Sequence, residues 1–163
     1  LNVAWELDLT GFAFDEIIGI RALPNGDLLL SGATSLNEVA GELLLLRLDS
    51  TGNLLWEQVL EGVDAETLRA MNDTQNGDLL VLSALSSADL GHAPFVHRID
   101  SFSNVLWAIE LPTAPHDANW GIFERGDSAI EIYGSVDGTI DDHAVWSLQV
   151  SSDGVEIVDP TAE

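Results

Sequence analysis

Apolar residues along this chain fall into short runs separated by turn residues, a pattern that predicts β-strands. The clearest stretch begins at Leu68 and reads LRAMND, the turn pair Asn76–Gly77, DLLVLSAL, a loop through Gly91 and Pro94, FVHRID and NVLWAIEL. Asn-Gly before an apolar run predicts a hairpin, because both residues tolerate a positive φ. The segment EVAGELLLLRL could be taken for a helix, but it fills the place of FVHRID, so we interpret it as a loop entering a strand.

An internal repeat is the strongest signal in the sequence. Trp5, Trp56 and Trp107 are spaced 51 residues apart, within the segments NVAWELDL, NLLWEQVL and NVLWAIEL. The remaining residues follow the same period, which makes residues 1–163 a single repeat domain. Its units are 2–52, 53–103 and 104–154, followed by an outer strand and tail over 155–163.

Each unit is expected to form four short antiparallel strands. We therefore predict an all-β fold of three four-stranded propeller-like blades, because a small sheet with two apolar faces needs neighbouring sheets to cover both. Gly19, Ala70 and Gly121 occupy equivalent positions and are all small. Blades that converge on an axis leave least room there, although common descent of the repeat would also explain the match.

Three blades cannot close a ring, because propellers need about four to eight. The chain begins with an outer-type strand, Asn2–Leu9, and ends with another, Val155–Val158. Three explanations remain open. The chain is a piece of a larger propeller, several chains complete a ring, or the amino-terminal strand is donated to the next copy in a head-to-tail assembly.

Composition excludes several classes of partner. The 163 residues contain 28 Asp and Glu against 5 Arg and no Lys, a formal charge of −23. Such a chain has no cationic face for nucleic acid or for an anionic membrane. It has no cysteine, hence no disulfide or thiolate chemistry. With 46% hydrophobic residues it has ample material for a core.

The residues resemble a known family. An acidic residue four before a small one, then NGD, an apolar strand and LLLRLDSTGNLLWEQVL, is similar to the roughly 50-residue propeller-type repeats of secreted bacterial surface proteins. It is more broadly similar to kelch and quinoprotein-like blades. The resemblance implies a recognition scaffold with no shared chemistry. The third unit departs from the pattern, because Gln149 and Ser151 replace Arg and Asp and VEIV lacks a Trp.

Two acidic groups are candidate metal sites. The first is an equivalent set near one end of the predicted axis, which could ring a cation but more commonly would accept backbone hydrogen bonds in a turn. It consists of Asp15, Glu66 and Asp117. The second is an acidic loop that offers oxygen ligands to Ca²⁺ without matching an EF-hand, and a solvated loop is its ordinary interpretation. It consists of Asp137, Asp141 and Asp142.

Aromatic and imidazole side chains give further candidates. Trp120 and Trp146 break the repeat and could form a partner surface, with core packing as the alternative. His92 and His143 are equivalent but expected too far apart to share a metal, and His97 and His116 lie elsewhere.

No catalytic motif is evident, so we expect a non-enzymatic, extracellular or surface-exposed structural protein without a cofactor, Ca²⁺ apart. Its expected partner is another copy of itself, or other blades, bound through the terminal strands. The alternative is a ligand-binding module for calcium-dependent adhesion or glycan recognition, excised from a larger propeller.

Overall fold

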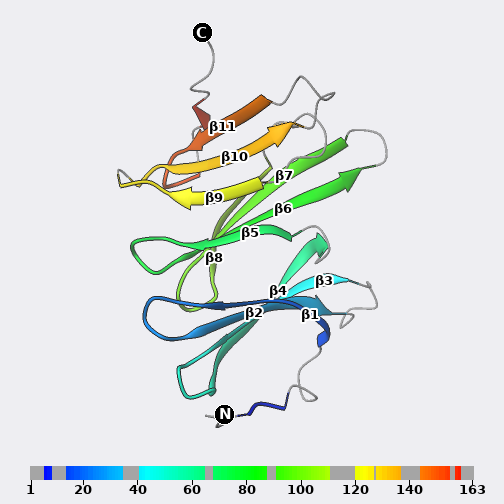
Figure 1. Ribbon diagram of the computed structural model, residues 1–163, viewed down its shortest axis with the longest axis vertical. Helices are drawn as coiled ribbons and strands as arrows, with labels where there is room; N and C mark the ends of the chain where they lie inside the picture. Colours follow the sequence, from blue (N-terminus) through cyan, green and yellow to red (C-terminus); the bar gives the residue numbers. More distant parts are fainter. Residues whose placement is uncertain are drawn as a thin grey trace. The chain divides into compact units, whose positions relative to one another are not determined.

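The computed structural model of the chain describes residues 6–8, 14–34, 41–64, 68–87, 91–110, 120–126, 128–136, 144–154 and 157–158. Over these ranges the chain forms only strands and turns, arranged as three open antiparallel sheets (Figure 1), which confirms the all-β prediction. These ranges contain no helix long and apolar enough to cross a membrane. Contacts divide the chain into two compact units, Leu1–Glu66 and Thr67–Glu163, which are described separately.

The first unit contains one sheet, sheet 1, in the order β1-β2-β3-β4. Its strands are β1 (Phe14–Ala22), β2 (Leu28–Thr34), β3 (Glu42–Leu48) and β4 (Leu54–Asp64). The segment EVAGELLLLRL enters the sheet as predicted, since its second half is β3.

The second unit contains sheet 2, in the order β5-β6-β7-β8, and sheet 3, in the order β9-β10-β11-β12. The strands of sheet 2 are β5 (Leu68–Asp73), β6 (Leu79–Ser87), β7 (Gly91–Ile99) and β8 (Val105–Glu110). Those of sheet 3 are β9 (Trp120–Glu124), β10 (Ile130–Val136), β11 (Ala144–Val150) and β12 (Ile157–Val158).

Three details differ from the sequence prediction. The predicted loop through Gly91 and Pro94 is strand, because β7 pairs with β6 as far as Gly91. Residues 6–8 of the predicted strand Asn2–Leu9 form no strand, and the rest of that segment lies outside the described residues. The predicted terminal strand Val155–Val158 is not unpaired, because its described part, β12, pairs with β11 and completes sheet 3.

The hairpin turns keep the same backbone conformation from repeat to repeat, even where the residue with a positive φ changes. In the turn after β1 Gly26 has a positive φ of 90°, and Asn25 does not. The Asn-Gly pair therefore does not form the hairpin turn in which both central residues have a positive φ. In the third repeat Ser128 takes that position with a φ of 67°. Gly126 lies two residues before this position, so the third repeat keeps the register of the turn with Ser128 in place of glycine.

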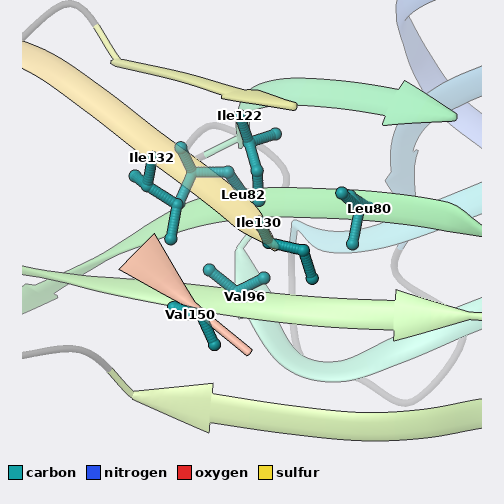
Figure 2. Close-up of a cluster of buried hydrophobic side chains, with 7 residues drawn as sticks. All are labelled: Leu80, Leu82, Val96, Ile122, Ile130, Ile132 and Val150. Carbon is teal, nitrogen blue, oxygen red and sulfur yellow. The ribbon is translucent and has the colours of Figure 1, made fainter. Parts of the chain in front are cut away.

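Sheets 2 and 3 share one hydrophobic core (Figure 2). Leu80, Leu82 and Val96 of sheet 2 pack against side chains of sheet 3, and all of them are nearly inaccessible to water. The sheet 3 members of this core are Ile122, Ile130, Ile132 and Val150. Each sheet therefore buries one face against the other, which is the arrangement expected of adjacent blades.

The small position of the repeat is required by a neighbour within its own sheet. Gly121 pairs with Tyr133 across β9 and β10, and a Cβ on Gly121 would overlap the tyrosine ring. Gly19 pairs with Ser31 in the same way, and its Cβ would lie 2.9 Å from Ser31 Oγ. Contacts inside one sheet thus explain the glycines at positions 19 and 121, whereas Ala70 packs against the core shared by sheets 2 and 3.

Candidate functional site

A groove of about 490 Å³ runs along the turn end of the boundary between sheets 2 and 3. The hairpin turns after β5, β9 and β11 meet there, because successive antiparallel hairpins turn at the same end of a sheet. The groove is lined by Asn76, Arg98, Leu106, Trp107, Glu124, Ser128, Ser152 and Asp153.

Arg98 is the central polar group of this groove, and it is buried. Its Nε lies 2.8 Å from Asp78 Oδ2, and its Nη2 lies 2.8 Å from the same oxygen and 3.8 Å from Glu124 Oε1. Its Nη1 donates a hydrogen bond of 2.8 Å to the carbonyl oxygen of Ser152. One guanidinium therefore joins two strands of its own sheet to two segments of sheet 3.

Trp107 lies opposite Arg98 on β8 and contacts the same turn of sheet 3. Its Nε1 donates a hydrogen bond of 3.2 Å to the Ser152 carbonyl oxygen. Gly154, with a φ of 71°, lies against the indole, where an added Cβ would come within 2.7 Å of a ring atom. Trp107 is thus an inter-sheet packing residue.

Further hydrogen bonds close the boundary on the β5–β9 side. The backbone N–H of Gln75 donates to Glu124 Oε2 at 2.6 Å, and the Gln75 side chain donates to the carbonyl oxygen of Arg125 at 3.1 Å. Asn72 donates to the carbonyl oxygen of Ile122 at 3.1 Å. Glu124, whose side chain is 3% exposed, is therefore held from both sides.

The ion pair between Arg98 and Asp78 has a counterpart in the first repeat and none in the third repeat. Asp27 and Arg47 form the same pair as Asp78 and Arg98, with Arg47 Nη2 2.8 Å from Asp27 Oδ2. In sheet 3 Gln149 takes the position of the arginine and pairs with Val158. The departure seen in the sequence thus removes a structural ion pair.

A second repeated device is the Asp turn that precedes each outer strand in the first two repeats. Asp49 Oδ1 accepts the backbone N–H groups of Thr51 and Asn53, and Oδ2 accepts the Asn53 side chain at 2.9 Å. These bonds, led by that from the Asn53 side chain, hold the pKa of the exposed Asp49 carboxyl below its usual range. The bond from Asn104 likewise lowers the pKa of Asp100.

The groove is suited to binding and offers no evident acid–base pair. Arg98 and Glu124 are already engaged at its floor. Its accessible groups are the exposed Asn76, Ser128, Ser152 and Asp153, together with Leu106, which is 51% exposed. Because the only cation in the lining is paired, the groove favours neutral or cationic ligands over anions.

Most of the site residues expected from sequence lie where the structure gives no side-chain placement. Asp15, Trp120 and Trp146 belong to β1, β9 and β11, but their side chains are outside the described set. Glu66, Asp117, Asp137, Asp141, Asp142, His116 and His143 lie outside the described residues altogether, and His92 is placed only as backbone in β7. Among the described residues no cluster of three or more His, Asp or Glu could hold a metal ion.

His97 is the one histidine whose side chain is described, and it is 6% exposed on β7. Burial lowers its pKa to about 4. Its Nδ1 has no hydrogen-bond partner among the described residues, and its ring lies 4.8 Å from that of Phe95, centroid to centroid. His97 is therefore a neutral core residue at physiological pH.

Sequence reasoning missed the groove and the part played by Arg98 in it. The signal was present, because the arginine and the Asp of NGD recur together in the first two units and are absent together from the third. No family model matches this sequence. A comparison with curated proteins finds no match either.

Proposed function

We propose that this chain is a non-enzymatic structural protein built from propeller-like blades, and that it associates with other copies of itself through its terminal segments. The observation that carries the proposal is the amino-terminal segment Asn2–Leu9, which has the outer-strand sequence pattern although its described residues, 6–8, form no strand.

A competitor for the place of β12 lies in the first residues of the sequence. Asn2–Leu9 repeats the outer-strand pattern of β4 and β8, including its Trp. A strand bearing that Trp would bury more apolar area on β11 than β12, where Val158 takes the Trp position. Exchange of β12 for Asn2–Leu9 of another copy would complete one sheet and link the two chains.

Propeller-like stacking is supported by the second unit. Sheets 2 and 3 pack through equivalent faces of two repeats, and Arg98 and Trp107 fix their turn ends. We propose on this basis that the repeat is a blade. Secretion or surface exposure is proposed on the family resemblance alone.

Strand exchange is tested by the mass of the protein in solution. Light scattering on the full chain over a range of concentrations should show oligomers, and deletion of residues 1–9 should leave a monomer. Deletion of residues 159–163, which carry no outer-strand pattern, is the matched control and should leave the oligomers intact. Oligomers that survive loss of residues 1–9, or a full chain that is monomeric throughout, would overturn strand exchange.

A second candidate function, ligand binding, is favoured by the groove beside Trp107. Its exposed amide, hydroxyl and carboxylate groups next to an indole suit a neutral sugar. A glycan array probed with the full chain and with the Asn76→Ala variant tests this candidate, because binding at the groove should be lost in the variant. For calcium, a melting temperature unchanged at millimolar Ca²⁺ would count against binding.

A further inference from the structure

We infer that neighbouring copies also pack face to face, with the Tyr133 face of sheet 3 seated on the Ile20 face of sheet 1 of the next copy. This inference rests on the proposed self-association and names the surfaces it uses. The Ile20 face comprises Ile17, Ile20, Leu28, Leu30, Leu46 and Leu48. The Tyr133 face comprises Gly121, Phe123, Glu131, Tyr133, Ser147 and Gln149.

The second unit shows how such a contact is made. Ile122 and Ile132 are paired across β9 and β10, and both are buried on sheet 2. The facing side chains are Ala70, Leu80, Leu82 and Val96, with Trp107 and Ile109 from the outer strand. A blade of this repeat therefore offers one face to the blade before it and the other face to the blade after it.

The Ile20 face is the counterpart of the face that sheet 3 buries. Ile20 pairs with Leu30 as Ile122 pairs with Ile132, at a spacing of 102 residues. Yet Ile122 is 4% exposed and Ile20 is 66% exposed, with Ile17 at 41%. An isoleucine that the repeat buries in one sheet is thus open to water in the other, and a covering blade would remove this apolar area from water.

Leu7 indicates that the chain itself supplies the outer segment of the blade that would cover the Ile20 face. It packs against the cluster Leu30, Leu44, Leu46 and Leu48 on sheet 1. Its counterpart 102 residues on is Ile109 of β8, which packs on the equivalent cluster of sheet 3. Leu7 therefore takes the place of an outer-strand residue of a preceding blade, and that blade needs three more strands.

Sheet 3 of another copy is the candidate for those strands, because its Tyr133 face is the counterpart of the face by which sheet 2 packs on sheet 3. Its free face is more polar than the matching face of sheet 2, since Glu131, Tyr133 and Ser147 stand where Leu80, Leu82 and Val96 stand. It keeps an aromatic pair, Phe123 and Tyr133, with centroids 6.0 Å apart, and Tyr133 is 45% exposed. A tyrosine within a polar surround is typical of non-obligate interfaces, so this contact should be weaker than that between sheets 2 and 3.

Pairing of two Ile20 faces with each other would also cover the isoleucines, but it leaves the Tyr133 face of sheet 3 uncovered. In the head-to-tail contact, the segment containing Leu7 of one copy completes sheet 3 of another copy, and that sheet packs on the Ile20 face of the first. Each contact therefore uses the amino-terminal segment of one copy and sheet 3 of the other. Two different surfaces then meet, which generates chains of copies unless the rotation closes a ring.

Two aspartate variants test this geometry. Ile20→Asp and Tyr133→Asp alter exposed side chains on the two faces, and Leu106→Asp, equally exposed but on neither face, is the control. Far-UV circular dichroism and melting temperature establish that each variant folds. Each face variant alone should lose the long assemblies, while the control keeps them.

An equal mixture of the two face variants decides the issue. Each retains one intact surface, so the mixture should form a species of twice the chain mass that does not extend further. Free assembly of Tyr133→Asp alone would overturn the inference in favour of Ile20 faces pairing together. A mixture that stays monomeric would overturn it as well.

The single tyrosine of the chain supplies an independent readout. With 3-fluorotyrosine incorporated, its one ¹⁹F resonance should shift with concentration in the full chain and stay fixed in Ile20→Asp. Deletion of residues 1–9 separates the two proposals. If that variant still assembles and Ile20→Asp does not, the face contact stands and strand exchange fails. The opposite result removes the face contact alone.

Discussion

Arg98 donates a hydrogen bond of 2.8 Å from Nη1 to the carbonyl oxygen of Ser152, and so joins sheet 2 to the last turn of sheet 3. The same guanidinium pairs with Asp78 and lies 3.8 Å from Glu124. One buried cation therefore makes polar contacts with two segments of sheet 3.

Replacing Arg98 by alanine should destabilise the second unit by about 3 kcal/mol, because two carboxylates and a carbonyl oxygen lose their donor in a buried site. Arg98→Lys keeps the charge but not the planar fork, so it should lose less. Urea unfolding followed by tryptophan fluorescence measures both. A loss below about 1 kcal/mol for Arg98→Ala would show that water replaces the lost donors.

Stability should fall with acid through the buried His97. The pKa of this group is about 4 in the folded protein and near 6.5 when unfolded, so the folded state favours neutral imidazole. Its contribution is complete above about pH 6.5, declines as pH falls, and levels off below about pH 4, a total of at most about 3 kcal/mol.

The variant His97→Leu isolates this effect, since Leu46 and Leu148 occupy the equivalent positions. Urea midpoints between pH 7 and 4 should flatten relative to the parent chain. Asp49 and Asp100, with lowered pKa values, lose their stabilising charge only at lower pH. Equal slopes in parent and variant would assign the acid sensitivity to other groups.

The turn before β8 carries a residue in a strained conformation. Ser103 has a φ of 72°, where the equivalent Gly52 and Gly154 have 88° and 71°. Ser103→Gly should therefore raise the free energy of unfolding by about 0.5–1 kcal/mol, relief of strain outweighing the added freedom of the unfolded chain. The reverse change, Gly52→Ser, should lower it by a similar amount. Thermal unfolding of both variants provides the comparison.

Self-association should strengthen with salt. Copies carrying a charge of −23 repel one another, and the screening length falls from about 30 Å at 0.01 M salt to about 10 Å at 0.1 M. Light scattering at fixed protein concentration should show mass rising with added NaCl, and more steeply with a divalent salt. Falling mass would mean that attraction between unlike charges drives the contact.

The repeat made much of the fold predictable. Strict spacing located the strands, and the hairpins after β1 and β5 fell where Asn-Gly predicted them. The end of the Gly91 loop was harder to place, because Pro94 suggested a break, whereas it pairs with Ala84 on β6 and lies beyond the described pairing of β7 with β8. The left-handed residue of the turn after β9 could not be recognised from residue type, since Ser128 adopts the conformation expected of glycine.

The candidate site was less predictable, for a physical reason. Residue type alone does not identify a site, because His97, an imidazole in the interior of the sheet, is neutral and structural through its burial. The groove arises where two repeats meet, so its lining residues are spread from Asn76 to Asp153 and no local motif contains them. In the sequence, only the joint replacement of the Asp of NGD and of the Arg in the third repeat indicated this groove.

The polar bonds between sheets 2 and 3 have a mechanical consequence. The hydrogen bonds from Gln75, Arg98 and Trp107 all lie at the turn end of the strands, while the shared core along the sheets is apolar. Hydrogen bonds break over short extensions, so a force applied at the turn end meets stiff resistance. A force applied at the far end peels apart apolar surfaces one layer at a time. Under load sheets 2 and 3 should therefore separate first at the end away from the groove beside Trp107, and the groove end should act as the hinge.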